Sequence, residues 1–248
     1  MAELLLRARD ITVRFGGLTA VDAVSADFHA GELVGIIGPN GAGKTTFFNA
    51  ISGVIAPTSG QLIAGGHNLS GKGPHRYAAA GIARTFQTPR VFPDMQVSAN
   101  IGFGLKFAGR RREGAWHLRS EESILELIGL GAQAALPAAA ITPSQQRLLE
   151  IGMALATRPR MLLLDEVAAG LTEAEIESMA QLIRRMRDEL GMTVVWIEHA
   201  VTTLLRHVER VIVLHQGRVI ADGTPAGVVR DAGVIEAYLG DEMVESAL

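Results

Sequence analysis

The chain has 248 residues, a formal net charge of −3 and a pI of about 6.2, so no excess of positive charge indicates a nucleic-acid partner. It contains no cysteine, which excludes a disulfide framework and a thiolate metal site. No apolar run approaches the roughly 18 residues of a membrane span, and 48% hydrophobic residues with only 5% aromatics are typical of a parallel sheet covered by helices.

Residues 4–30 predict a small antiparallel sheet that is half exposed, because apolar and polar residues alternate in two runs. The apolar positions are Ile11, Val13 and Phe15 in the first run and Val24, Ala26 and Phe28 in the second. Phe15 is open to two interpretations. It belongs either to the core or to a surface on which a nucleotide base stacks.

A glycine-rich loop follows the short buried strand expected over residues 33–37 and precedes a helix expected over residues 45–51. The loop reads Gly38-Pro39-Asn40-Gly41-Ala42-Gly43-Lys44-Thr45-Thr46 and fits the pattern G-x-x-x-x-G-K-[ST]. Its glycines let backbone N–H groups approach a polyphosphate closely. Lys44 adds a positive charge, and the Thr45 hydroxyl suits a magnesium ion. The sequence therefore predicts a site for a nucleoside triphosphate.

The next elements lead to a single glutamine. Turns at residues 57–60 and 65–66 enclose a short strand over residues 61–64, and a helix over residues 74–80 ends at Gly81. A strand over residues 82–86 then ends on Gln87. A side chain at such a strand end reaches the crevice where α/β proteins bind ligands.

Residues 90–154 predict an inserted helical subdomain, with helices over residues 97–108 and 120–130. Between these helices, Arg110-Arg111-Arg112 is a basic turn that either faces solvent or meets anionic lipid headgroups. Thr142-Pro143-Ser144-Gln145 begins the last helix of the insert with a capping box. The apolar face of this helix consists of Leu148, Ile151, Gly152 and Leu155.

Two buried strands, over residues 161–164 and 194–197, each end in polar residues. Asp165 and Glu166 follow the first strand, where the aspartate can hold magnesium through its water shell. The glutamate is placed to orient or deprotonate a water that attacks a γ-phosphate. His199 follows the second strand and is either a donor to the same phosphate or a structural histidine.

The remaining elements complete an alternation of strands and helices. A helix capped by Thr172 carries the stripe Ile176, Met179, Ile183 and Met186. A hairpin pairs residues 211–214 with residues 218–221, and Thr224-Pro225 caps a final helix. This order predicts an α/β fold with a mostly parallel sheet.

Taken together, these features resemble the ATP-binding subunits of ABC transporters over nearly the whole chain. The resemblance implies a P-loop NTPase (RecA-like) core at residues 1–89 and 155–248, which includes a small N-terminal antiparallel β subdomain. It also implies an α-helical subdomain at residues 90–154 and binding of ATP with Mg²⁺. The residues that match the nucleotide-binding motifs are Phe15 for adenine stacking; Gly38, Asn40, Gly41, Gly43, Lys44, Thr45 and Thr46 for the Walker A loop; and Thr142, Ser144 and Gln145 for the signature. The residues that match the hydrolytic machinery are Lys44, the Q-loop Gln87, the catalytic Glu166 and the switch His199, and the metal-binding set is Thr45, Gln87 and Asp165.

Local strings look like the ATPases of branched-chain amino-acid importers. They are Phe15-Gly16-Gly17-Leu18, residues 81–87, Ala168-Ala169-Gly170-Leu171 and Ile197-Glu198-His199. Relatives that import urea or amides, or export lipopolysaccharide, share much of this pattern. The segment after Gln87, with the apolar residues Val91, Phe92 and Met95, matches the part of the family that meets a helix of the membrane subunit.

Three positions depart from the family. Residues 141–145 read Ile-Thr-Pro-Ser-Gln where the family has a signature like LSGGQ, so both glycines are replaced. Val167 stands where a proline usually follows the catalytic glutamate, and Thr172 ends the D-loop in place of Asp or Asn. Because two subunits of this family pack head to tail, an altered signature affects the partner's ATP site and favours a heterodimer with one strong and one weak site.

The expected function is therefore the ATPase subunit of an importer for branched-chain or related amino acids. The resemblance implies transmembrane permease subunits, a second ATPase subunit (identical or different) and, indirectly, a periplasmic or extracellular substrate-binding protein. It implies peripheral attachment to the cytoplasmic face of the inner membrane. The alternatives are a soluble ABC ATPase of translation or DNA repair, and a module that binds ATP without useful turnover. The intact Glu166 and His199 argue against the second alternative.

Overall fold

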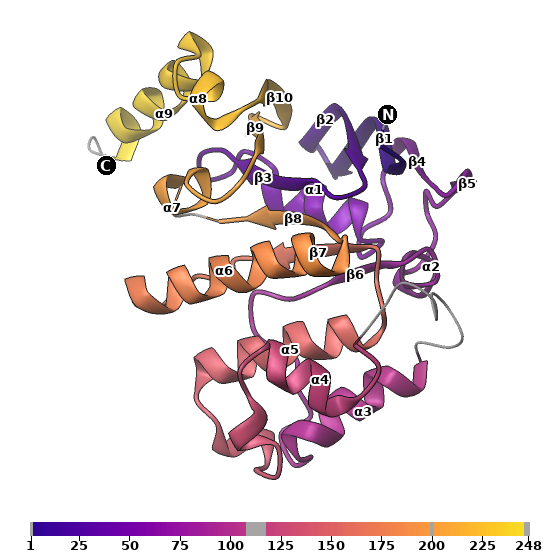
Figure 1. The fold of residues 1–248 in the computed structure, drawn as a ribbon. Helices are drawn as coiled ribbons and strands as arrows, with labels where there is room; N and C mark the ends of the chain where they lie inside the picture. Colours follow the sequence, from indigo (N-terminus) through magenta and orange to yellow (C-terminus); the bar gives the residue numbers. More distant parts are fainter. Residues whose placement is uncertain (1, 108–117, 199–200, 246–248) are drawn as a thin grey trace.

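The computed structural model describes residues 2–107, 118–198 and 201–245 and contains two sheets and a group of helices. Helices α3, α4 and α5 lie together on one side of the larger sheet, with α6 between them and the strands (Figure 1). The smaller sheet, with β1, β2 and β4, lies on the other side. None of the helices in the described ranges is long and apolar enough to cross a membrane.

The larger sheet carries the phosphate loop. Its strand order is β10-β9-β3-β8-β7-β6, and every neighbouring pair is parallel except the hairpin of β9 and β10. The strands are β3 (Leu33–Ile37), β6 (Ile82–Arg84), β7 (Met161–Asp165), β8 (Thr193–Ile197), β9 (Arg210–His215) and β10 (Arg218–Gly223). Because β3, β6, β7 and β8 run in the same direction, the segments after them meet at one edge of the sheet. This confirms the mostly parallel α/β core.

Both faces of the central strands β3, β7 and β8 are buried, which explains why these strands are almost wholly apolar. Leu162 and Leu164 of β7 pack into the cluster formed with the helices, whereas Leu163 packs into the cluster on the opposite face. Trp196 and Val195 of β8 divide in the same way. The alternation places the apolar side chains of β7 and β8 in one cluster or the other, so each strand is packed on both sides.

The smaller sheet is antiparallel, as predicted, with the order β2-β1-β4-β5. It comprises β1 (Leu4–Phe15), β2 (Leu18–His29), β4 (Ser59–Ala64) and β5 (His67–Asn68). Register shifts interrupt the pairing of β1 with β2, and Asp10 and Ala23 have positive φ angles of 48° and 50° there. These irregularities change which residues face inward along each strand. Ile11 and Val13 are buried, but Phe15 is 50% exposed, so its interpretation as a core residue is wrong.

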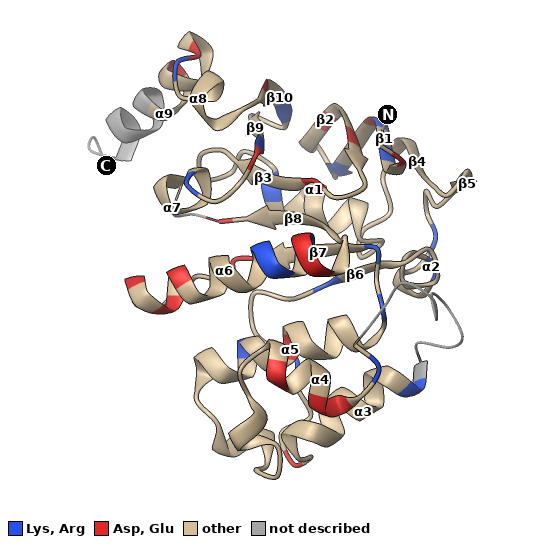
Figure 2. Cartoon of the chain, in the orientation of Figure 1, with Lys and Arg blue, Asp and Glu red and all other residues tan. Residues whose placement is uncertain are grey.

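The expected helices occur in the predicted order, and α7 is a helix that the sequence analysis did not predict. The helices are α1 (Lys44–Ile51), α2 (Pro74–Ala79), α3 (Val97–Phe107), α4 (Glu121–Leu127), α5 (Pro143–Ala156), α6 (Glu173–Leu190), α7 (Val201–Leu205), α8 (Pro225–Val228) and α9 (Ala232–Glu245), with two 3₁₀ turns at Gly131–Gln133 and Ala138–Ala140. Thr142 and Thr172 form the capping boxes expected at α5 and α6. Acidic and basic residues both occur along α6 (Figure 2), where Arg185 pairs with Glu189 at 2.8 Å.

Two expected elements differ from the structure. The strand expected over residues 82–86 ends at Arg84. After Arg84 only the Thr85 N–H still bonds to the neighbouring strand, to the Leu163 carbonyl at 2.9 Å. The final helix capped by Thr224 is the single turn α8, and a separate helix, α9, follows it. The basic turn at residues 110–112 lies outside the described residues. The subdomain boundaries at residues 90 and 154 stay a prediction.

Candidate functional site

The phosphate loop, residues 38–46, connects β3 to α1 as predicted. Two of its glycines occupy positions that no other residue fits. A Cβ on Gly38 would lie 2.1 Å from the Leu214 carbonyl oxygen, and one on Gly43 would lie 2.4 Å from the Ala20 carbonyl oxygen. Both also have positive φ angles, 152° and 95°. The backbone of the loop is therefore fixed by its surroundings in a turn whose N–H groups can face an anion.

Lys44 lies within this loop and is nearly buried. Its ammonium group donates to the carbonyl oxygens of Gly38 at 2.6 Å and of Pro39 at 2.9 Å. These contacts hold the positive charge over the loop. A phosphate seated in the loop offers stronger, charged acceptors to the same ammonium group.

Phe15 lies beside the phosphate loop. It lines a cavity of about 320 Å³ together with Leu18 and Ala20 of β2, and the rest of the lining is residues 40–46. An exposed aromatic ring next to a phosphate loop is a platform on which a base can stack. The position of Phe15 is compatible with stacking on a base, which stays a prediction.

Gln87 and Glu166 meet at the carboxyl edge of the larger sheet. The Gln87 side-chain amide donates to Glu166 Oε2 at 2.8 Å. Glu166 follows β7 with a φ angle of 49°, which is unusual for a residue with a side chain, and its N–H bonds to the Ile197 carbonyl at 3.0 Å. The N–H bond holds the backbone of Glu166, and the Gln87 amide orients the carboxylate of this residue, which is only 7% exposed.

Asp165 is the last residue of β7 and is paired with Arg84, a residue that the sequence did not single out. The Arg84 guanidinium donates to Asp165 Oδ2 at 2.8 Å, and both side chains are largely buried. Arg84 also donates to Asn49 Oδ1 of α1 at 2.7 Å and to Ser52 Oγ at 2.8 Å. Arg84 therefore joins β6, β7 and the helix that follows the phosphate loop. The available signal was a charged residue inside a buried strand.

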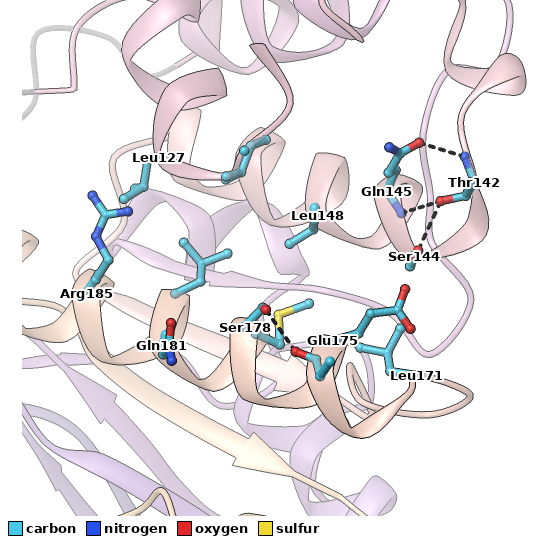
Figure 3. Close-up of a pocket in the computed structure, with 15 residues that line it drawn as sticks. Leu127, Thr142, Ser144, Gln145, Leu148, Leu171, Glu175, Ser178, Gln181 and Arg185 are labelled. Atoms are coloured by element: carbon cyan, nitrogen blue, oxygen red, sulfur yellow. Dashed lines mark hydrogen bonds between the residues drawn. The ribbon is translucent and has the colours of Figure 1, made fainter. Parts of the chain in front are cut away.

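The signature residues Thr142, Ser144 and Gln145 lie elsewhere. They border a cavity of about 600 Å³ between α5 and α6 (Figure 3), whose lining shares no residue with the cavity at the phosphate loop. The Thr142 side chain accepts from the Gln145 N–H at 3.2 Å, and the Gln145 side chain accepts from the Thr142 N–H at 3.0 Å. Ser144 Oγ is 3.0 Å from Thr142 Oγ1 and lies beside Glu175 of α6. The signature and the phosphate loop of one chain thus belong to different surfaces.

Two further side chains that the sequence did not single out hold the loop after Glu166. Arg147 of α5 donates to the carbonyl oxygens of Val167 at 3.0 Å and Ala169 at 2.6 Å. Glu198 Oε1 accepts from the Ala168 N–H at 2.6 Å and from the Trp196 indole at 2.9 Å. Burial raises the pKa of the Glu198 carboxyl above its usual range. His199, the next residue, lies outside the described residues.

The comparisons with known proteins identify the family. The family model described as ABC transporter matches residues 21–169, more than half of the chain, and a model described as branched-chain amino acid ATP-binding cassette transporter matches residues 218–244. The chain is 37% identical to the high-affinity branched-chain amino acid transport ATP-binding protein BraF of Pseudomonas aeruginosa. It is 36% identical to LivG of Escherichia coli K12, which carries the same description. Both alignments cover 97% of this chain and 100% of the relative.

Solved structures agree with this result. A nucleotide-free ATP-binding cassette from an ABC transporter superposes with a TM-score of 0.80 at 28% identity, covering 95% of this chain and 98% of the other. The ADP conformation of an ATP-binding cassette of an ABC transporter also gives a TM-score of 0.80, at 29% identity, covering 96% and 99% of the two chains. These matches confirm the P-loop NTPase fold. The chain is therefore a member of the ABC transporter family of ATP-hydrolysing cassettes.

Proposed function

We propose that this chain supplies the ATP hydrolysis that drives an importer for branched-chain or related amino acids. The observation that carries the catalytic part is the bond between Gln87 and Glu166 at the sheet edge that also holds the phosphate loop. The substrate class rests on the relatives BraF and LivG, which are branched-chain amino acid transport proteins by name and match this chain over their full length.

The nucleotide site has two parts in this proposal. The backbone N–H groups of residues 38–46, with Lys44, bind the phosphates, and Phe15 stacks on the adenine. Their common cavity at the phosphate loop supports this arrangement. Thr45, Asp165 and Gln87 provide the hydroxyl, carboxylate and amide oxygens that magnesium prefers, and these groups fit that ion. Magnesium bound with the nucleotide would neutralise charge that develops on the phosphate oxygens.

Glu166 is the residue that orients the attacking water and accepts its proton. The Gln87 amide donates to its carboxylate, and the bond of its N–H to the Ile197 carbonyl holds its backbone. Arg84 fixes the direction of the Asp165 carboxylate beside it. His199 is assigned to hydrogen bonding with the γ-phosphate. The whole arrangement resembles a pre-organised site, in which little has to move when the phosphoryl group is transferred.

We also propose that a second ATPase subunit completes each nucleotide site. Thr142, Ser144 and Gln145 border a cavity distinct from that of their own phosphate loop, so they contact ATP only across an interface between two subunits. Pro143 has no N–H to offer, and Ser144 fills space that a glycine leaves open. The stronger site of the heterodimer then combines this chain's phosphate loop with the intact signature of the partner. The weaker site combines the partner's phosphate loop with this chain's altered signature.

The membrane attachment follows from the same assignment. The segment with Val91, Phe92 and Met95 docks on transmembrane permease subunits at the cytoplasmic face of the membrane, and a substrate-binding protein outside delivers the amino acid to them. Phe92 is 39% exposed and forms an edge-to-face pair with the 42% exposed Phe103, with ring centroids 4.9 Å apart. An exposed aromatic pair of this kind suits a protein contact.

Copurification tests the proposal. A tagged chain, expressed in its own host and extracted from membranes in mild detergent, should bring down two permease subunits and a second ATPase. The purified assembly should hydrolyse ATP, and the Lys44→Ala assembly should not. Recovery of the chain with ribosomes or DNA-repair proteins and without a permease would favour the soluble class instead. The matched control is Val229→Ala, a substitution at an exposed apolar residue of the tagged chain.

A further inference from the structure

A buried glutamate on α5 accepts hydrogen bonds from the backbone on both sides of Gln87. Glu150 is 5% exposed, and its side chain leaves α5 towards the segment that follows β6. Glu150 Oε2 accepts from the N–H of Phe86 at 3.3 Å, and Oε1 accepts from the N–H of Arg90 at 3.0 Å. One carboxylate thus brackets residues 86–90.

This segment has few other means of holding its shape. The strand ladder ends at β6 and Thr85, and Pro89 has no N–H to donate. The Phe86 ring packs under the guanidinium groups of Arg84 and Arg90, at 4.6 Å and 4.2 Å from its centroid. The Glu150 carboxylate supplies acceptors for two backbone donors of a segment without regular structure. Charged acceptors of this kind make stronger hydrogen bonds than neutral ones.

Burial of the Glu150 carboxylate lowers the stability of the fold, because the charge is removed from water. Its neighbours Leu149 and Ile151 are fully buried, and burial raises the pKa of the Glu150 carboxyl to about 7, against the opposing effect of the two backbone N–H groups. Arg147 and Arg84 offset part of the cost through their positive charges. An apolar residue of similar size would avoid this desolvation penalty.

The contacts form a continuous path from the helical segment to the site. Glu150 of α5 holds residues 86–90, Gln87 within them donates to Glu166 Oε2 at 2.8 Å, and Glu166 follows β7. Arg147, one turn earlier on α5, holds the loop after Glu166 from the other direction. Two side chains of α5 therefore contact both the segment that carries Gln87 and the loop that follows Glu166.

We propose that Glu150 is a positioning residue for ATP hydrolysis, which keeps Gln87 on Glu166 by clamping the backbone at Phe86 and Arg90. The inference rests on the proposed function, because it assigns Glu150 a part in the same reaction. Glu150 does not touch the nucleotide. It acts on the rate of the chemical step through Gln87 and leaves the affinity of the phosphate loop for ATP unchanged.

The test is a double-mutant cycle on the ATPase assembly copurified with its permease. Glu150→Gln keeps the size of the side chain but turns an NH₂ group towards one of the two N–H donors. We expect kcat to fall about 10-fold with KM for ATP unchanged within about twofold, as for a lost charge-assisted contact. The Gln87→Ala variant already lacks the amide that Glu150 positions. In that background, Glu150→Gln should lower kcat by less than about twofold.

Two controls separate the possible results. Glu122→Gln removes the same charge from an exposed residue of α4 and should leave kcat as in the parent. The inference is overturned if Glu150→Gln hydrolyses ATP at the parental rate, or if its cost is the same with and without Gln87. Failure of the proposed function would look different, since the Glu166→Gln assembly would then hydrolyse ATP as fast as the parent.

Discussion

At the scale of single residues, the site depends on two carboxylates that neighbouring side chains hold in place. Glu166 combines a positive φ angle of 49° with a side chain held by Gln87, and Asp165 beside it is paired with Arg84. A carboxylate so restrained needs little reorganisation before it acts as a base.

Replacing Glu166 tests that role directly. Glu166→Gln keeps the shape of the side chain and an oxygen that accepts a hydrogen bond, but the amide cannot take a proton from water. Steady-state hydrolysis should therefore fall at least about 100-fold. ATP affinity should stay near that of the parent, whereas Lys44→Ala should weaken ATP binding itself. The measurement is turnover and nucleotide affinity for both variants. Near-normal turnover by Glu166→Gln would remove Glu166 from its assigned role.

Glu150 gives a second residue-level prediction, on stability. Its pKa is about 7 in the folded chain against an ordinary value of 4.5, so between these pH values the folded state binds a proton that the unfolded state has released. The stability that this proton contributes is present below pH 4.5 and is lost as the pH rises through about 7. Glu150→Gln has no carboxyl proton to lose. The difference in free energy of unfolding, variant minus parent, should therefore increase by up to about 3 kcal/mol as the pH rises from 4.5 to 8.

Denaturant titrations of the two isolated chains over this pH range measure the difference. A difference that does not change with pH, or that changes in the opposite sense, would mean that Glu150 is not desolvated in solution. A variant that is more stable at pH 8 yet slower in hydrolysis would separate positioning from simple packing.

At the scale of elements, the proposal assigns the contacts with partner subunits to two segments. The first is the stretch after Gln87, whose backbone is fixed by Asn100 of α3. The Phe92 N–H donates to Asn100 Oδ1 at 2.8 Å, and Asn100 Nδ2 donates to the Phe92 carbonyl at 3.1 Å. Asn100 is fully buried, so a buried side chain holds the backbone of Phe92, while Phe92 itself is 39% exposed. The second is the N-terminus of α5, with its altered signature.

Phe92→Ala should separate the ATPase from the permease. Removing an exposed ring at the centre of a protein contact costs about 2 kcal/mol or more of binding, so copurification and transport should be lost. Nucleotide affinity of the isolated chain should not change, because Phe92 is outside the phosphate-loop cavity. Ile235→Ala, at an equally exposed apolar residue of α9, is the control. Survival of copurification and transport would place the docking surface elsewhere.

Rebuilding the signature tests the asymmetric dimer. Purified alone, the chain should hydrolyse ATP slowly, because Pro143 and Ser144 cost each composite site one or two charge-assisted hydrogen bonds of about 1.5–3 kcal/mol each. The triple change Thr142→Ser, Pro143→Gly and Ser144→Gly should raise that rate at least about 10-fold. Ser120→Gly, which removes only the cap of α4, should not. Fast turnover by the unmodified chain, unchanged by the rebuilding, would rule out this explanation.

At the scale of the whole molecule, the sequence predicted the architecture well because its signals are local. Buried strands are continuous aliphatic runs, and the caps at Thr142 and Thr172 are set by residues three positions apart. What the sequence did not predict depends on contacts between distant segments. Phe15 is exposed because irregular pairing with β2 interrupts the alternation of β1. The strand β6 stops early because the Phe86 N–H bonds to the Glu150 side chain instead of to β7.

The site shows the same division. The phosphate loop, Gln87, Asp165 and Glu166 were predicted from motifs, and three of their neighbours were not. Arg84 is 81 residues from Asp165, and Glu150 is 64 residues from Phe86, so no spacing in the sequence indicates either pair. Arg147 likewise acts on backbone carbonyls, which any residue type provides. Only the fold brings these groups together.

Uptake in reconstituted vesicles tests the central proposal most directly. The chain, with its copurified permease and second ATPase, would be placed in liposomes with radiolabelled leucine and its substrate-binding protein on one side and ATP on the other. We predict leucine uptake that requires ATP and falls to background with Glu166→Gln in this chain. Uptake that continues at the parental rate with Glu166→Gln, or ATP hydrolysis that moves no branched-chain amino acid, would contradict the account.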